Sequence, residues 1–205
     1  MFLLMSKQRP EIDGELSEWI GHQHIFFVAT APLSIDAHMN LSPKGGDSFR
    51  VLGPMEVAYQ EYTGSGAETV AHLRENGRII VMFCAFEGAP RVLRLHGRGE
   101  VIEVNDHRFD ALAKNFPAHS GTRSIIKIRV TRVSTSCGFA VPFFDFRAAR
   151  ETLDEWTAKQ GPEKVAAYRA TKNQFSIDGL PAFANAERLQ RLPGENGIAI
   201  PSNAS

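Results

Sequence analysis

The chain has 205 residues, of which 43% are hydrophobic and 22% are charged, as in an ordinary globular protein. This length suits one domain, or one domain with an appendage, and is enough to bury a sizeable core. Lys and Arg together number 23, and Asp and Glu also number 23, so the formal net charge is zero. This balance gives no overall field that would recruit nucleic acid or an anionic membrane, and we expect neither as a partner.

The N-terminal residues and the cysteines indicate the compartment. The opening MFLLMSKQRPEID has a short apolar run without the basic region and cleavage site of a secretory signal. No apolar stretch approaches the roughly 20 residues that span a bilayer. Cys84 and Cys137 have no metal-ligand spacing and are interpreted as reduced thiols. The sequence therefore predicts a soluble, cytoplasmic protein without a metal site.

The first part of the chain predicts a helix followed by short strands. Residues 15–23 have a helical apolar face, and residues 24–30 are rich in β-formers. We expect this strand to form a hairpin with a strand over residues 37–42, which a turn at residues 43–46 would end. Two more short strands are predicted over residues 49–52 and 56–59.

The rest of the chain predicts longer elements. The strand over residues 78–86 is the most apolar and is expected to be central. The strand over residues 91–102 alternates between an apolar face and a basic face that carries Arg94 and His96. The remaining predicted elements are helices over 66–75 and from 105 to 116, a strand over 123–133, and two charged helices over 147–159 and 162–171.

These elements indicate a mainly β (α+β) fold. Six or seven mostly antiparallel strands without regular βα alternation exclude a doubly wound parallel sheet. A small closed or partly closed barrel would leave few open sheet edges. We divide the chain into a barrel domain over 1–145, a helical extension over 146–191 and a flexible tail over 192–205.

Two donor-rich segments flank one apolar stretch and suggest a site for a flat, phosphorylated ligand. In the strand over 37–42, His38, Asn40 and Ser42 share a face. In the loop YTGSGAET, which begins at residue 62, glycines would let backbone amides approach an anion. The alternative for this loop is an N-capping turn, with Ser65 as the cap and Glu68 completing a capping box.

Other residues leave similar alternatives open. Lys44 could form a charge-assisted bond to a ligand, or it could be a solvated turn lysine. Arg94 and His96 could face solvent on the barrel, or they could reach a cleft in a partner subunit. His72, inside a predicted helix, is interpreted as a residue of its polar face. The nucleotide-binding, zinc-protease and serine-hydrolase motifs GxGxxG, GxxxxGK[ST], HExxH and GxSxG are absent.

The order of HMNLSPKG, EYTGSGAETVAHLREN, RIIVMFCAF and RVLRLHGRGEV resembles the pyridoxamine 5′-phosphate oxidase-like family of FMN-binding split barrels. The resemblance covers roughly residues 16–135. It implies a six-stranded antiparallel Greek-key split β-barrel with flanking helices. It also implies a homodimer that holds one FMN in each of two clefts between the subunits.

The resemblance also assigns roles to individual residues. It implies that Asn40, Ser42 and Lys44 line the flavin and its ribityl chain, and that Tyr62 and Thr63 meet the polar edge of the ring. It places Ser65, Gly66, Glu68 and Thr69 at the FMN phosphate. It also implies that the partner subunit contributes Arg94 and Trp156.

The sequence departs from the family pattern in two places. Pyridoxamine phosphate oxidases have an Arg-Lys pair beside the FMN phosphate, where this chain reads Ala67-Glu68-Thr69. The C-terminal Arg and His substrate motif of the family is not evident. The hypothesis is therefore an FMN-dependent oxidoreductase acting on a small-molecule substrate, with no catalytic residue assigned. The alternatives are a flavin-binding or sensing protein without turnover, and a split barrel that uses a deazaflavin or haem.

Overall fold

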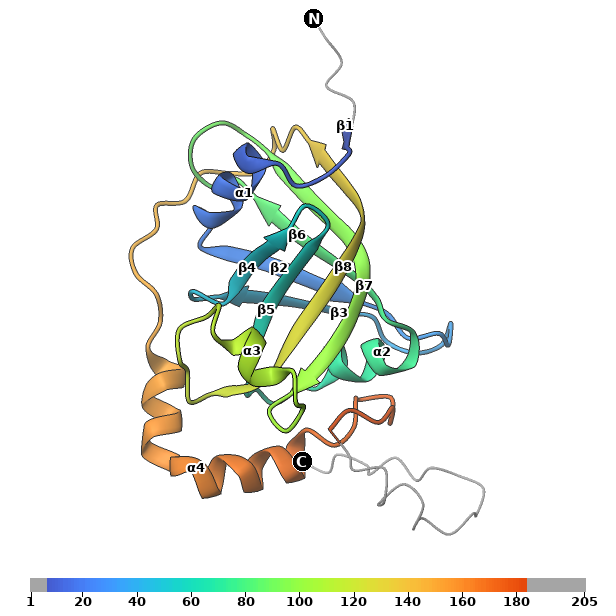
Figure 1. The fold of residues 1–205 in the computed structure, drawn as a ribbon, viewed down its shortest axis with the longest axis vertical. Helices are drawn as coiled ribbons and strands as arrows, with labels where there is room; N and C mark the ends of the chain where they lie inside the picture. The colour runs from blue at the N-terminus through green and yellow to red at the C-terminus, as the bar shows by residue number, and fades with distance from the viewer. Residues whose placement is uncertain (1–6, 184–205) are drawn as a thin grey trace, which may run out of the picture.

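The computed structural model describes residues 7–183 and contains one antiparallel sheet that curls around a core (Figure 1). The sheet has eight strands in the order β3-β2-β6-β7-β8-β5-β4, and β1 pairs with β8 beside this path. The strands are β1 (Lys7–Arg9), β2 (Ile25–Thr30), β3 (Asn40–Gly45), β4 (Phe49–Gly53), β5 (Glu56–Tyr62), β6 (Arg78–Cys84), β7 (Val92–Glu103) and β8 (Thr122–Ser136).

The helices lie at the ends and one side of this curled sheet (Figure 1). Within residues 7–183 they are α1 (Gly14–Gly21), α2 (Glu68–Asn76), α3 (Phe109–Ala113) and α4 (Thr152–Lys172). The segment between β8 and α4 runs along the outside of the barrel to its opposite end (Figure 1). None of the helices in this part of the chain is long and apolar enough to cross a membrane.

The predicted fold class is confirmed, with more strands than expected. The hairpin between β2 and β3 forms as predicted, with Thr30 opposite Asn40. The turn predicted at residues 43–46 is wrong, because β3 continues through Pro43 to Gly45. This is physically acceptable because β3 lies at the edge of the sheet, where a missing N–H is tolerated on the unpaired side.

One helical prediction is confirmed and another needs correction. The two helices predicted over 147–159 and 162–171 are both present as the two halves of α4, which meet at a kink at Gly161 (φ 73°) just before Pro162, although the first half begins later, at Thr152. The helix predicted from 105 to 116 is the short α3, and the Asp106 carboxylate accepts the Arg108 N–H (2.9 Å) ahead of it. The predicted tail over 192–205 lies outside the described residues.

The register of the strands defines an inner and an outer face of the sheet. Ser42 lies opposite Val28, Val28 opposite Val81, and Val81 opposite Leu95, and these three hydrophobic residues are fully buried. One residue further along, Pro43, Phe27, Met82 and Arg94 form the corresponding row on the outer face. Asn40, Ser42 and Lys44 therefore point to the inside of the barrel, and Arg94 points away from it.

The pairing between β7 and β8 depends on a glycine. The register shifts between His96 and Gly97, and a Cβ on Gly97 would lie 2.6 Å from the Arg129 carbonyl oxygen and 2.7 Å from Ile128 Cγ2. We expect Gly97→Ala to lower the free energy of unfolding by about 1–3 kcal/mol, because backbone has to move. Urea denaturation would measure this change.

The matched control is Gly14→Ala, because a Cβ at Gly14 would meet nothing within 4 Å. We expect this variant to unfold at the same urea concentration as the unchanged protein. Equal stability of the Gly97 and Gly14 variants would contradict the close approach of β7 to β8.

Candidate functional site

The inner face of β3 meets the start of α2 through a short chain of side-chain hydrogen bonds. Ser42 Oγ donates to Asn40 Oδ1 at 2.7 Å. Asn40 Nδ2 donates to Thr30 Oγ1 at 3.2 Å and to Thr69 Oγ1 at 3.1 Å. Three of the predicted site residues, Asn40, Ser42 and Thr69, are thus brought together. Asn40 and Ser42 are half-buried, while Thr69 is buried.

A buried histidine supports this group from behind. His72 Nδ1 lies 2.9 Å from Thr30 Oγ1, and Nε2 has no partner among the described residues. Burial lowers the pKa of His72, which favours a neutral imidazole. The interpretation of His72 as a residue of the polar helix face is therefore wrong. Its location could not be inferred from helical spacing alone, because its partner Thr30 is distant in sequence.

A buried carboxylate lies between two cations at the next position along β3. Lys44 Nζ lies 3.1 Å from Glu61 Oε1, and Arg123 Nη2 lies 2.9 Å from the same oxygen. The Glu61 side chain is 2% exposed and that of Arg123 is 5% exposed. Burial by itself would raise the pKa of Glu61, but Lys44 and Arg123 together lower it. Glu61 is therefore an ionised carboxylate whose charge is neutralised inside the protein.

This arrangement excludes one of the two alternatives for Lys44. The residue is on a strand and is half-buried, so it is not a solvated turn lysine. Its ammonium group has three N–H donors, and Glu61 is the only acceptor in the described part of the chain. Lys44 therefore retains donor capacity on the inner side of β3.

The glycine loop after β5 is exposed, and its carbonyls and its amides are used differently. The Gly64 carbonyl accepts from Asn173 Nδ2 and the Gly66 carbonyl accepts from Arg123 Nη2, each at 2.9 Å. Residues 64–66 are exposed, and their N–H groups have no acceptor within residues 7–183. The Gly64 carbonyl and the Ser65 N–H belong to one trans peptide and point in opposite directions, so this amide and the Ser65 hydroxyl form a pair of free donors on the exposed loop.

The capping box that was the alternative for this loop does not form. Helix α2 begins at Glu68 after Ala67, and no side chain caps its N-terminus. The Glu68 carboxylate instead accepts the Ile177 N–H at 3.1 Å, and its pKa is raised by burial. Asp178 lies close enough to contribute to that shift. The chain's own carboxylates therefore face this helix N-terminus, and Glu68 is unsuited to contact a phosphate dianion.

The Tyr62 ring lies against the loop that precedes β8. It stacks on His119, with the ring centroids 4.0 Å apart and the planes 19° apart. The Tyr62 hydroxyl donates to Gln60 Oε1 at 3.1 Å. Burial raises the pKa of Tyr62 to about 12, so the phenol is neutral at physiological pH.

Thr63 is buried and belongs to a junction with α4. Its N–H and its hydroxyl both donate to the Gly121 carbonyl, at 2.8 and 2.9 Å. Arg169 of α4 donates from Nε to Thr63 Oγ1 at 2.7 Å and from Nη2 to the Gly121 carbonyl at 3.2 Å. Both proton donors of Thr63, its N–H and its hydroxyl, are thus used within the protein.

Two predicted site residues lie away from this group in a single chain. Arg94 is on the outer face of the sheet, where Nη1 donates to Ser136 Oγ at 3.1 Å. Trp156 is on α4 and packs edge-on against Tyr168, with the centroids 5.3 Å apart. Neither contacts β3 or the glycine loop within one subunit.

The segment after α4 also contacts the site, and sequence patterns did not reveal it. Besides Asn173 and Arg169, Asp178 accepts from the His38 backbone N–H and lies 2.8 Å from His38 Nδ1. This pair raises the pKa of His38 and lowers that of Asp178. Residues more than 100 positions apart thus join the β2–β3 connection and the glycine loop to the C-terminal segment.

Comparison with known proteins identifies the family. The family model for pyridoxamine 5′-phosphate oxidase matches residues 12–137. The chain is 40% identical over 196 residues to the pyridoxamine 5′-phosphate oxidase family protein ustO of Aspergillus flavus, covering 86% of this chain and 78% of that protein. The chain therefore belongs to the pyridoxamine 5′-phosphate oxidase family. The matched region ends before α4, so Arg169 and Asn173 lie outside it.

Two solved structures resemble this chain at lower sequence identity. HupZ of Group A Streptococcus is 23% identical, with a TM-score of 0.47, and covers 60% of this chain and 91% of its own. An FAD-binding protein of Mesorhizobium loti is 12% identical, with a TM-score of 0.45, and covers 64% of this chain and 95% of its own.

The paired charges at Glu61 give a testable stability effect. We expect Glu61→Gln to lower the free energy of unfolding by about 3–5 kcal/mol, because the variant leaves two cations without their buried counterion. The folded-state pKa of Glu61 lies below its usual 4.5, so this stabilisation is present above that pH and lost as the pH falls below it. Denaturation curves at neutral and acidic pH would measure both effects.

The control is Glu56→Gln, which removes a partly exposed ion pair with Lys127 at 3.1 Å. This variant should lose less than about 1 kcal/mol. The difference between the Glu61 variant and the unchanged protein should shrink on acidification. A difference that stays constant down to strongly acidic pH would contradict an ionised Glu61.

Proposed function

We propose that this protein is a cytoplasmic FMN-binding flavoprotein that acts as an FMN-dependent oxidoreductase on a small-molecule substrate. The observation that carries the proposal is the convergence of the polar face of β3 with the start of α2 and the donor-rich glycine loop. Membership of the pyridoxamine 5′-phosphate oxidase family supports the same ligand class. Cys84 and Cys137 are both free, which is compatible with a reducing compartment.

The donors of the glycine loop fit a phosphate group. The three exposed amides of residues 64–66 and the Ser65 hydroxyl have no partners in the described chain and are available to anionic oxygens. Arg123 holds the Gly66 carbonyl of the loop, while its own charge is paired with Glu61. We infer that these neutral donors take the place of the Arg-Lys pair that the sequence lacks.

The polar residues of β3 fit the remainder of the cofactor. Asn40 and Ser42 offer amide and hydroxyl groups that suit a ribityl chain or the polar edge of a ring. Lys44 would place a positive charge near the flavin, which favours a reduced, anionic ring. When bound, FMN would supply the hydride chemistry, and these side chains would hold and orient it.

The outer face of the sheet supports a homodimer with the cofactor between subunits. Leu41 is 67% exposed on edge strand β3, and neighbouring Met39 is 82% exposed. Phe27 and Met82 extend this apolar surface across β2 and β6 towards Arg94. Contiguous exposed apolar surface of this kind marks interaction sites. A second copy covering it would also bring Arg94 of the partner subunit near the cleft.

Cofactor binding can be tested through the glycine loop. We expect Ser65→Ala to weaken FMN affinity about fivefold, the effect of losing one hydrogen bond of ~1 kcal/mol. Titration of FMN with the protein, followed by quenching of flavin fluorescence, would measure the dissociation constant. Ser34→Ala removes an exposed hydroxyl from the β2–β3 connection and should leave the affinity unchanged.

Two results would contradict this proposal. Absence of FMN binding by the unchanged protein would exclude FMN as the cofactor. Equal FMN affinity in the Ser65 and Ser34 variants would exclude the glycine loop as its binding site. Bleaching of bound FMN by NADH or NADPH under anaerobic conditions separates an oxidoreductase from a flavin-binding protein without turnover.

The homodimer makes an independent prediction. Leu41→Asp would place a charge in the centre of the proposed interface, and we expect it to convert a dimer into a monomer. Sedimentation equilibrium would measure the mass in solution. Val104→Asp changes another exposed residue beyond the end of β7 and should leave the dimer intact. A dimer that survives Leu41→Asp would exclude this face as the interface.

A further inference from the structure

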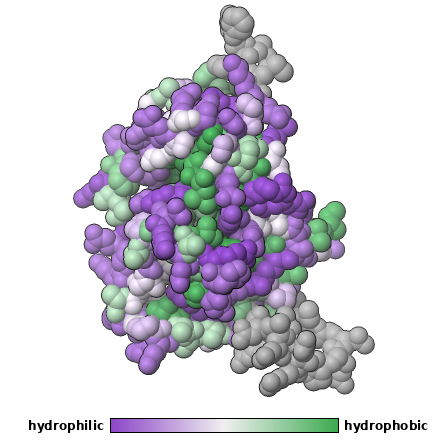
Figure 2. Space-filling view, viewed as in Figure 1, coloured by the Kyte–Doolittle hydropathy of each residue, from purple (hydrophilic) through white to green (hydrophobic). Residues whose placement is uncertain are grey.

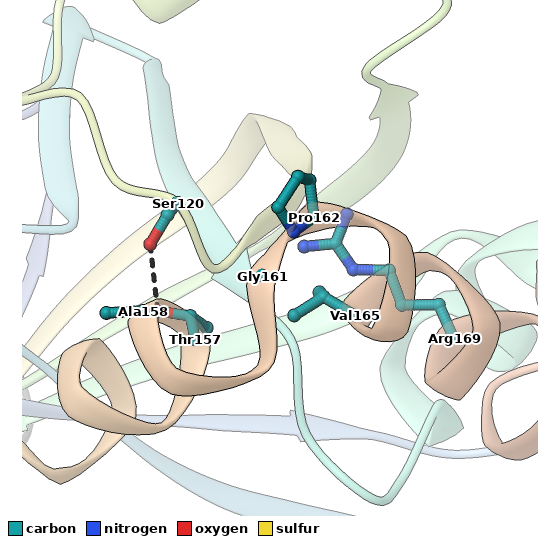
Figure 3. Close-up of a pocket in the computed structure, with 7 residues that line it drawn as sticks. All are labelled: Ser120, Thr157, Ala158, Gly161, Pro162, Val165 and Arg169. Atoms are coloured by element: carbon teal, nitrogen blue, oxygen red, sulfur yellow. Dashed lines mark hydrogen bonds between the residues drawn. The ribbon is translucent and has the colours of Figure 1, made fainter.

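A small cavity lies where α4 bends against the loop that precedes β8 (Figure 3). The helix is broken by Gly161, whose φ of 73° lies in the left-handed region, and it resumes at Pro162. The cavity has a volume of about 290 Å³ and is lined mainly by Ser120, Thr157, Ala158, Pro162, Val165 and Arg169. None of these residues is assigned a contact with the flavin, although Arg169 also bonds Thr63 beside the glycine loop.

Arg169 brings an incompletely paired positive charge to this cavity. Its Nε and Nη2 atoms are fixed by Thr63 and Gly121, while Nη1 has no hydrogen-bond partner in residues 7–183. No carboxylate in that range forms an ion pair with the guanidinium group, which is half-buried. Burial and the nearby Arg123 lower the pKa of Arg169, yet a guanidinium stays charged in proteins. Its environment therefore favours an anion from outside.

The two hydroxyls at the cavity act as acceptors towards a ligand. Thr157 Oγ1 donates to the Asp154 carbonyl at 3.0 Å. Ser120 Oγ, which lies 2.8 Å from Thr157 Oγ1, then acts as the donor in that pair (Figure 3). Both hydroxyl protons are used within the protein. Among the side chains that line the cavity, Arg169 therefore has the N–H groups that remain for an anion.

The remaining wall of the cavity is apolar. Val165 is buried at its base, and Ala158 and Pro162 complete the lining on either side of the helix break. A ligand that fills this space would bury an apolar body against these side chains. A volume near 300 Å³ lies at the lower end of the range for small-molecule sites.

We propose that this cavity binds a small monocarboxylate with an apolar body, and that its carboxylate pairs with Arg169. One guanidinium balances one negative charge, and the second N–H of Nη2 together with an N–H of Nη1 remains for the two oxygens of a carboxylate. A phosphate monoester would bring a second negative charge for which the cavity offers no second cation. The proposal does not depend on flavin binding, because the cavity and the flavin site use different residues.

The experiment uses the full chain without added flavin, with benzoate as the probe. Ligand-observed NMR detects binding, and isothermal titration calorimetry compares benzoate with its neutral analogue benzamide. We expect benzoate to bind at least ten times more tightly than benzamide. Arg169→Gln and Ala158→Phe should each weaken benzoate binding at least tenfold, the first by removing the charge and the second by filling the cavity.

Two control variants separate the cavity from the rest of α4. Lys164→Gln removes an exposed cation from the same helix, and Ala166→Phe adds the same bulk at an exposed position outside the cavity. Both should bind benzoate as the unchanged protein does. Because Arg169→Gln also removes two bonds to the barrel, Ala158→Phe tests the cavity with those bonds left in place.

Any of the following outcomes overturns the proposal. Absence of benzoate binding, equal binding of benzoate and benzamide, or unchanged binding in Ala158→Phe would exclude a carboxylate site in the cavity. Phenyl phosphate binding more tightly than benzoate would assign the cavity to phosphate esters instead. Failure of FMN to bind would leave these results unaffected, so either proposal can be wrong while the other is right.

Discussion

The ionised carboxylate of Glu61, buried between Lys44 and Arg123, is the constraint on which the rest of the site depends. A buried charge without partners would cost several kcal/mol, so both cations are required to keep it there. Lys44 belongs to edge strand β3, Glu61 to β5 and Arg123 to β8. The cluster therefore connects edge strand β3 with β5 and β8, which lie towards the other end of the sheet, across the inside of the barrel. Through the Gly66 carbonyl, Arg123 also fixes the glycine loop.

The segment after β8 completes the same structure from outside the region that the family model matches. Arg169 fixes Thr63, Asn173 fixes the Gly64 carbonyl, and Asp178 pairs with His38. The loop is held by Arg123 on one side and by this segment on the other. Its carbonyls are occupied by internal donors, and its amides are left for a ligand. The C-terminal segment, predicted from the sequence as a helical extension, thus contacts the candidate site.

The sequence predicted the parts of this structure that follow from local periodicity. Alternation along β3 placed Asn40 and Ser42 on one face, and alternation along β7 placed Arg94 on the face opposite the core residues. Partners distant in sequence could not be predicted in the same way. The interior position of His72, the pairing of Lys44 with Glu61 and the contacts of α4 depend on tertiary packing. The predicted Ser65 cap failed for this reason, since the surrounding fold positions the loop without a side-chain cap.

Charge placement links the two ligand sites that we propose. Arg123 lies near enough to Arg169 to lower the pKa of Arg169, and of these two guanidinium groups only Arg123 forms an ion pair with Glu61 in the described chain. Arg123 is consequently neutralised inside the protein, while Arg169 retains unsatisfied charge that faces the cavity at the bend of α4. The glycine loop, in contrast, has negative charge beside it, because Glu68 and Asp178 lie at the start of α2. A phosphate there must rely on neutral amides and a hydroxyl, whereas an anion in the cavity meets a full positive charge. The two anion sites that we propose on this chain of zero net charge would thus have different chemical preferences.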